Sequence, residues 1–192
     1  KWRVLEQDGD DLFLMTDQVL DCKRYNEKDK DVTWETCTLR QWLNNDFYDT
    51  AFSESEQESV KWTTVINDDN PDFGTKGGND TADRLFLLSL SEITNTNYGF
   101  DGNLDFDDQT RCCKASAYAK EQGCYISEYH TSCWWMRSPG FASSAASVVI
   151  NEKYVVDSQG YVSYFGDVVD ADENGVRPAL HLNAANAEIS LV

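Results

Sequence analysis

Short apolar stretches alternate with turn residues along much of the chain. Val4-Leu5 and Leu12-Phe13-Leu14 flank the pair Asp8-Gly9, which predicts an N-terminal β-hairpin. The apolar run from Leu85 to Leu90, interrupted only by Ser89, fits a buried strand. Beyond Trp134 the apolar pieces are separated by Gly, Asn and Asp, a pattern typical of an antiparallel sheet. The strand-like pieces in that region are 147–150, 154–156, 161–165 and 176–182.

Helical signals are confined to the first two thirds of the chain. Thr38 has the character of an N-cap for a helix over 39–43, and Ser53-Glu54-Ser55-Glu56 has the form of a capping box. A third helix is predicted over 115–122, closed by Gly123. The fold class we predict is α+β, with helices in the N-terminal two thirds and antiparallel strands in the C-terminal third. Since no repeat or linker is evident, residues 1–192 should form a single domain.

Charge narrows the classes of partner. The chain has 34 Asp and Glu against 16 Lys and Arg, a formal net charge of −18. This charge repels phosphate backbones and anionic lipid, so we expect no nucleic-acid partner. No apolar run approaches the ~20 residues of a membrane-spanning helix, so we expect no membrane insertion. Because strand-like residues follow Lys1 directly, we interpret the sequence as a fragment of a longer precursor.

The cysteines leave two interpretations open. Six are present, at 22, 37, 112, 113, 124 and 133, and six cysteines allow 15 pairings that sequence cannot distinguish. Disulfides and buried free thiols are both compatible with this number. Zinc is the weakest alternative, because the spacings of the last four do not match the C-x2-4-C knuckles of structural zinc sites.

One acidic loop has the composition of a calcium site. Asp68, Asp69, Asn79 and Asp80 bring carboxylate and amide oxygens close to Gly77 and Gly78. Calcium prefers such hard oxygen ligands, so we interpret these four residues as a tentative calcium site, with no cofactor otherwise required. The alternative is a set of Asx turns that bond their own backbone.

Signals of catalysis are weak. The two histidines, His130 and His181, are far apart in the sequence, and His130 lies close to Ser132 and Cys133 without evidence that they meet in space. The common nucleotide-binding, hydrolase and metalloprotease motifs are not found. We therefore predict a protein that is not an enzyme and has no catalytic residues.

The region after Ser138-Pro139-Gly140 mixes aromatic residues with Ser, Asp and Asn. Tyrosine with small polar residues is common in binding surfaces, because its ring supplies rigid contact area while its neighbours adapt their hydrogen bonds. An ordinary sheet with aromatics in its core has the same composition, so both interpretations stay open.

Several longer motifs are distinctive: Cys133-Trp134-Trp135-Met136-Arg137-Ser138-Pro139-Gly140, Gly175-Val176-Arg177-Pro178-Ala179-Leu180, Trp2-Arg3-Val4-Leu5, the stretch from Val32 to Asn44, and Gly77-Gly78-Asn79-Asp80. Together they resemble an uncharacterised domain family of gut bacteria, mainly Firmicutes. The resemblance implies a C-type-lectin-like fold of the type found in formylglycine-generating enzymes. The family is also similar to the variable proteins of diversity-generating retroelements, which bind ligands through a hypermutated C-terminal segment.

The resemblance implies a variable segment at 141–174 between two constant frames. It implies a ligand-binding domain, receptor- or adhesin-like, that is extracellular or on the cell surface and binds an unknown protein or glycan. Adenine mutation of asparagine codons cannot yield Glu, Lys or Gln, so Glu152, Lys153, Gln159 and Glu173 should be constant. Valines 148, 155, 162 and 168 should face the core. The expected binding residues are Phe141, Ser143, Ser144, Tyr161, Ser163, Tyr164, Phe165, Asp167 and Asp170.

Two other functions stay open. One is a formylglycine-generating-type copper oxidase, in which Cys124 and Cys133 would form the copper-binding pair. The other is a static calcium-dependent carbohydrate-binding lectin, although the Glu-Pro-Asn and Gln-Pro-Asp triplets of sugar-binding lectins are missing.

Overall fold

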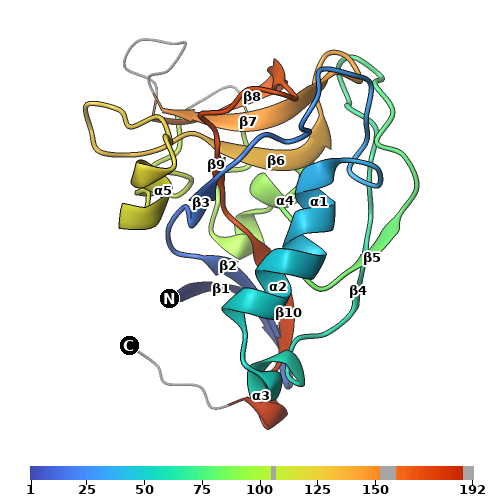
Figure 1. The fold of residues 1–192 in the computed structure, drawn as a ribbon, viewed down its shortest axis with the longest axis vertical. Coiled ribbons are helices and arrows are strands. Elements are labelled where there is room, and N and C mark those ends of the chain that lie inside the picture. Colours follow the sequence, from blue (N-terminus) through green and yellow to red (C-terminus); the bar gives the residue numbers. More distant parts are fainter. Residues whose placement is uncertain (105–106, 152–158, 188–192) are drawn as a thin grey trace.

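A computed structural model describes residues 1–104, 107–151 and 159–187, and three sheets make up its framework (Figure 1). The largest has five strands in the order β3-β9-β6-β7-β8, the second has the order β1-β2-β10, and the third pairs β4 with β5. The strands are β1 (Trp2–Asp8), β2 (Asp11–Thr16), β3 (Asp21–Cys22), β4 (Thr63–Val65), β5 (Thr81–Asp83), β6 (Trp134–Pro139), β7 (Ala145–Asn151), β8 (Gln159–Val168), β9 (Gly175–Val176) and β10 (Ala179–Asn183).

The helices are short and lie around the sheets. They are α1 (Thr38–Trp42), the π-helix η1 (Leu43–Phe47), α2 (Tyr48–Ala51), α3 (Glu54–Gln57), α4 (Leu90–Ile93), the 3-10 helix η2 (Thr96–Tyr98), α5 (Ala117–Glu121) and the 3-10 helix η3 (Ala184–Asn186). Cys37, not Thr38, is the N-cap of α1, where its sulfur accepts a hydrogen bond from the Arg40 N–H. The predicted capping box at Ser53 is present, and Gly123 follows α5 with a φ of 97°.

The predicted fold class is wrong. Strands predominate, and β1 to β5 all lie within the first 83 residues, so the chain is not divided into a helical N-terminal part and a stranded C-terminal part. The physical reason is long-range pairing: β2 pairs with β10, and β3 pairs with β9. Local periodicity cannot show such partners. The C-type-lectin-like layout inferred from resemblance is corrected with it.

The N-terminal hairpin is confirmed, because β1 and β2 pair antiparallel around Gly9, whose φ is 57°. The predicted strand at 85–90 is not found as a strand. Leu85 to Leu88 are buried as expected, but only Phe86 pairs, with Ala179, in an isolated bridge. Two carbonyls of this segment are hydrogen-bonded to Arg137: its guanidinium donates to Leu87 O, and its backbone N–H donates to Leu88 O.

The core lies on both sides of the five-stranded sheet. Every residue of β6 and β7 is buried, including Trp134 and Trp135, which are both fully buried. Val149 faces Trp134 and Val162 across the sheet, and Val148 faces Trp135. β8 is the outer strand and is only partly covered. The sheet therefore presents its exposed side chains along β8 and at the turn that joins β6 to β7.

Candidate functional site

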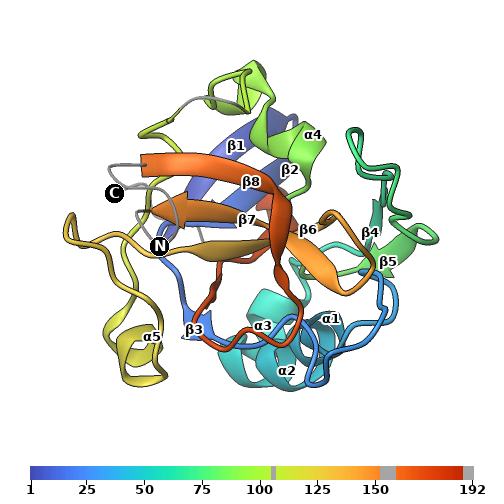
Figure 2. The same ribbon diagram turned by 90° about the horizontal axis from the view of Figure 1, so that it is seen from above.

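The β6–β7 turn, the end of β8 and the loop between β4 and β5 come together on one side of the molecule (Figure 2). Aromatic side chains from all three segments, most of them exposed, contact one another there. Phe141 follows β6, Tyr164 and Phe165 lie on β8, and Phe73 lies in the loop. We call Phe73, Phe141, Tyr164 and Phe165 the aromatic patch. The exposed fractions of Phe73, Phe141 and Phe165 are 45%, 45% and 53%.

The rings of the patch are ordered by contact with one another. Phe141 stacks on Phe165 with ring centroids 4.3 Å apart and an interplanar angle of 13°. Phe73 meets Phe165 edge-on at 5.7 Å and 84°, and its ring also lies 6.2 Å from that of Tyr164. Stacked and edge-to-face pairs are the favourable geometries for aromatic rings, so the patch has a preferred arrangement before any ligand arrives.

Two glycines allow the strands beneath the patch to approach closely. The Phe141 N–H donates to Phe165 O at 2.8 Å. A Cβ on Gly140 would lie 2.5 Å from that same carbonyl oxygen, and a Cβ on Gly166 would lie 2.4 Å from Ala146 O. Gly166 also has a φ of 86°, which other residues rarely adopt. Backbone atoms therefore fix the Phe141–Phe165 pair.

Asn70 attaches the loop that carries Phe73 to the large sheet. Its buried side-chain amide donates to Pro139 O at 2.9 Å and to Tyr164 O at 2.8 Å. Its Oδ1 accepts hydrogen bonds from the N–H groups of Asp72 and Phe73. One side chain thus connects β6, β8 and the loop, and it holds Phe73 against the other rings.

The remaining predicted binding residues differ in availability. Ser143, Ser144 and Asp170 are half-buried near the patch, whereas Tyr161 packs against the core. The Ser163 hydroxyl accepts a hydrogen bond from the Gly166 N–H. Asp167 is a structural residue, because its carboxylate accepts a hydrogen bond from the fully buried Asn174 amide at 2.8 Å.

Of the valines predicted to face the core, some are buried and one is exposed. Val148 and Val162 are buried as predicted. Val168 was expected in the core but is 48% exposed. A shift of register between β7 and β8 near Ala146, together with the positive φ of Gly166 within β8, interrupts the alternation on which that prediction depended. Val155, Glu152 and Lys153 lie outside the described residues.

Three of the four predicted calcium ligands, Asp69, Asn79 and Asp80, form hydrogen bonds within their loop or with its neighbours. Asp69 accepts hydrogen bonds from Lys76 Nζ and the Gly77 N–H, and Asp80 accepts one from the Asn67 N–H. The Asn79 amide donates to Glu35, and Asp68 is exposed.

These contacts are those of a loop closed on its own backbone, where a Cβ on Gly77 would lie 2.2 Å from Asn67 O. Within the described ranges, no group of three or more His, Cys, Asp or Glu side chains is arranged to hold a metal ion. Calcium therefore stays a prediction from composition, and the geometry adds nothing to it.

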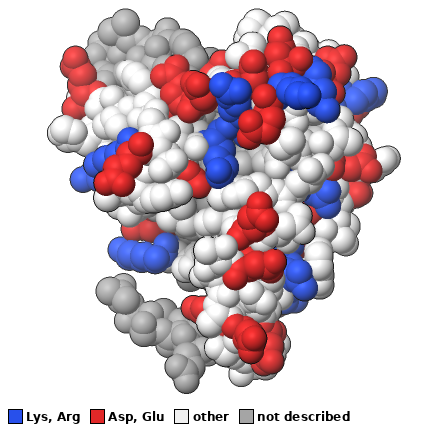
Figure 3. Space-filling model, viewed as in Figure 1, with Lys and Arg blue, Asp and Glu red and all other residues white. Residues whose placement is uncertain are grey.

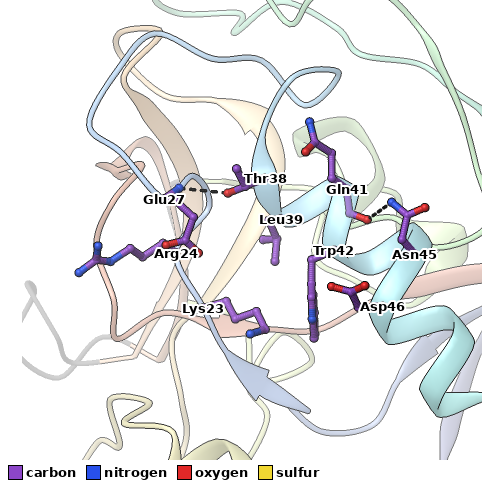
Figure 4. A pocket seen from close by; sticks show the side chains of 9 residues that line it. All are labelled: Lys23, Arg24, Glu27, Thr38, Leu39, Gln41, Trp42, Asn45 and Asp46. Atoms are coloured by element: carbon purple, nitrogen blue, oxygen red, sulfur yellow. Dashed lines mark hydrogen bonds between the residues drawn. The ribbon is translucent and has the colours of Figure 1, made fainter.

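Two hollows lie away from the patch. One, of about 400 Å³, lies between α1 and the segment after β3, where the Lys23 ammonium covers the Trp42 ring at 4.5 Å (Figure 4). Its lining residues are Lys23, Arg24, Glu27, Thr38, Leu39, Gln41, Trp42, Asn45 and Asp46. The other, of about 300 Å³, includes Arg137, Glu92 and His181. In the first hollow, the Trp42 ring is already covered by two side chains, because the Phe47 ring lies 5.0 Å from it and the Lys23 ammonium lies over it.

The residues considered for catalysis do not form a common site. His181 stacks on Phe13 at 4.6 Å and contacts Asp11, whereas His130 is exposed in a turn. Cys124, half of the copper pair in the oxidase interpretation, donates to the carbonyl oxygen of Asp21 at 3.6 Å, and Cys133 contacts Asn151. The two cysteines assigned to that pair therefore have different partners.

Comparison with known proteins places the chain in a family. The chain belongs to the family described as Domain of unknown function (DUF6273), whose model matches residues 9–184. No curated protein and no solved structure matches it. In the part of the chain that the structure describes, no helix is both long and apolar enough to cross a membrane.

Proposed function

We propose that this chain is a non-catalytic binding domain and that the aromatic patch is its contact surface for a protein partner. The observation that carries the proposal is the exposure of three phenylalanine rings on a backbone that is held from three sides. A contiguous exposed apolar surface rimmed by polar residues is a common mark of an interaction site. Ring order in the free protein lowers the entropy that binding must remove.

The composition of the patch favours a protein over a small molecule. Aromatic side chains at the centre with Ser143, Ser144 and Asp170 near them match the usual anatomy of protein interfaces, where a few aromatic residues dominate the binding energy. Small-molecule sites are concave, and the two hollows described above contain none of the four rings.

The charge of the chain adds a preference for the kind of partner. Acidic and basic side chains are interspersed over the face in Figure 3, yet the net charge is −18. A partner with a basic surface would be attracted over long distance, which raises its association rate most at low salt.

The same surface is suited to diversification, and we propose that residues 141–174 vary between related copies. The backbone contacts of Phe141, Ser143 and Ser144 involve only main-chain atoms: Phe141 N–H donates to Phe165 O, and the carbonyls of Ser143 and Ser144 accept from Val32 and Val169. Replacement of these three side chains leaves those bonds available.

Sequencing of this locus across related strains tests diversification. We expect substitutions concentrated in 141–174, with Glu152, Lys153 and Gln159 unchanged and with Phe73, which lies outside the segment, constant. Substitutions spread evenly along the chain would show instead a static binding surface.

The contact surface is tested with a displayed random-peptide library and an oligosaccharide array as probes. The variants are a triple replacement of Phe73, Phe141 and Phe165 by Ser, and Tyr118→Ser as a control at an exposed ring (56%) on α5. Peptides selected on the unmodified chain should bind the control equally and lose at least about tenfold in affinity for the triple variant.

Equal binding to all three proteins would place the contact surface elsewhere. An oligosaccharide that binds the unmodified chain and is lost in the triple variant, without peptide binding, would identify a glycan ligand instead.

A further inference from the structure

The segment that leads into strand β3 is bonded to the segment that leads into helix α5. Val19 forms a parallel bridge with Ala115, and the Ser116 N–H donates to Val19 O at 2.9 Å. The Ser116 hydroxyl donates to Leu20 O at 3.2 Å. The start of α5 is therefore fixed against the segment that leads into β3.

This contact brings two cysteines together. Cys22, at the end of β3, and Cys124, just after α5, are both buried. The sulfur of Cys124 lies 3.6 Å from the carbonyl oxygen of Asp21, the residue directly before Cys22. Cys22 is close enough to Cys124 to raise the pKa of the Cys124 thiol. Cys22 in turn donates to the carbonyls of Asp172 and Asn174, at 3.4 and 3.6 Å.

Other cysteines contact other groups. Cys37 donates to Trp34 O at 3.4 Å and caps α1, and Cys112 contacts the Asn151 side chain at 3.3 Å. Cys133 contacts the backbone of the same Asn151. Cys112 and Cys133 thus share Asn151 as a neighbour, whereas Cys124 contacts the residue next to Cys22 and its thiol is influenced by Cys22 directly.

We propose that Cys22 and Cys124 are a disulfide site, which closes when the chain meets a small-molecule disulfide as oxidant. The thiolate of one cysteine attacks the oxidant, forms a mixed disulfide and releases one thiol. The second cysteine then attacks the protein sulfur of the mixed disulfide and releases the other thiol. One protein S–S bond forms, the oxidant S–S bond is broken, and the two protein thiol protons leave with the two small thiols.

Once the native fold has formed, it slows disulfide formation between these two cysteines. The neighbouring Cys22 and burial together raise the pKa of the Cys124 thiol, so little thiolate is present at neutral pH. The bond should therefore close during folding, before α5 covers the sulfurs. It would join residues roughly 100 positions apart and thereby restrict the unfolded chain strongly.

The experiment refolds the full chain in a mixture of oxidised and reduced glutathione and counts free thiols after denaturation. We expect four free thiols instead of six, with peptide mapping that finds Cys22 linked to Cys124. Cys22→Ser and Cys124→Ser should each abolish the link, whereas Cys37→Ser, a control at a buried thiol, should retain it.

A second measurement compares melting temperatures. The oxidised chain should melt about 5 to 15 °C above the reduced chain, and Cys124→Ser should show no change with reductant. Six free thiols after refolding, or a link between other cysteines such as Cys112 and Cys133, would overturn the proposal. The mapping uses the unmodified chain, so it decides the question even where a serine variant fails to fold.

Discussion

Arg137 and Phe141 are four residues apart, yet they occupy opposite kinds of environment. Arg137 lies inside the molecule, where its guanidinium pairs with Glu92 and donates to the carbonyls of Ile66 and Leu87. Phe141 lies just past the end of β6 and is 45% exposed, with one face against Phe165. The comparison separates two uses of one strand: its buried part holds the fold together, and its end presents a surface.

The two environments share the loop between β4 and β5. Ile66, at the start of that loop, supplies a carbonyl to Arg137, and Asn70 further along donates to Pro139 and Tyr164. Changes at the buried end should therefore reduce stability, and changes in the loop should reduce both stability and ring order. Changes at the exposed rings should affect binding alone.

The largest effect is expected for Arg137→Ala. The substitution leaves Glu92 without its partner and two carbonyls without a donor, and loss of one member of a buried pair costs about 3–5 kcal/mol. Urea unfolding should show this loss. Arg24→Ala, which removes an exposed pair with Asp172, should cost less than about 1 kcal/mol. Equal effects of the two would contradict the role given to Arg137.

A smaller effect is expected for Asn70→Ala, at about 1–3 kcal/mol, because the carbonyls of Pro139 and Tyr164 each lose a donor and Pro139 O keeps the Ser147 hydroxyl. Loss of the anchor should also free Phe73 from Phe165, visible as collapse of the nuclear Overhauser contacts between their rings. Asn79→Ala removes one exposed bond to Glu35 and serves as the control. Retained ring contacts in Asn70→Ala would show that the rings order themselves.

A modest pH dependence is expected at Asp108. Burial alone would raise the pKa of this carboxyl, but hydrogen bonds from the Asp101 N–H and from Thr110, with the charge of Arg111, lower it. A lowered pKa gives stability that is present above about pH 4 and is lost as the pH falls below that value. Unfolding midpoints between pH 3 and 6 should fall less steeply for Asp108→Asn. If the unfolding midpoints of the unmodified chain and of Asp108→Asn fall equally with pH, Asp108 does not contribute to the acid sensitivity of the fold.

The smallest effect on stability is expected for Phe165→Ser. Because more than half of the side chain is exposed, the unfolding free energy should change by less than about 1 kcal/mol. Phe86→Ala, at a buried ring, should cost about 3–5 kcal/mol in the same assay. A large loss for Phe165→Ser would mean that the patch is part of the core.

Local signals in the sequence predicted local structure well. The Asp8-Gly9 turn, the Ser53 capping box and the Gly123 helix end follow from bonds within a few residues, and all three are present. The strand predicted at 85–90 failed because its carbonyls have separate partners that are far away in the sequence. Arg137 donates to Leu87 O through its guanidinium and to Leu88 O through its backbone N–H, and the Asn44 side chain donates to Leu85 O. The predicted fold class failed for the same reason, since long-range partners decide the sheets.

The candidate site was predicted in part. Phe141 and Phe165 are exposed and in contact, and Tyr164 is half-buried beside Phe73, whereas Tyr161 packs against the core and Asp167 is bound to Asn174. Phe73 was missed, because its contact with β8 depends on Asn70 and on a loop far away in sequence. A phenylalanine among Asn, Pro, Asp and Gly was the available signal, since a lone apolar side chain in a polar turn has no local reason to be there.

The position of β2 between β1 and β10 has a consequence for how the chain reaches its fold. β2 pairs with β1 as soon as the hairpin forms, but its other edge stays unpaired until Ala179–Asn183 is available. During synthesis, one edge of this apolar strand therefore stays unpaired until nearly the whole chain has been made. Folding should accordingly be slow and sensitive to protein concentration, because neighbouring copies can offer the missing partner first.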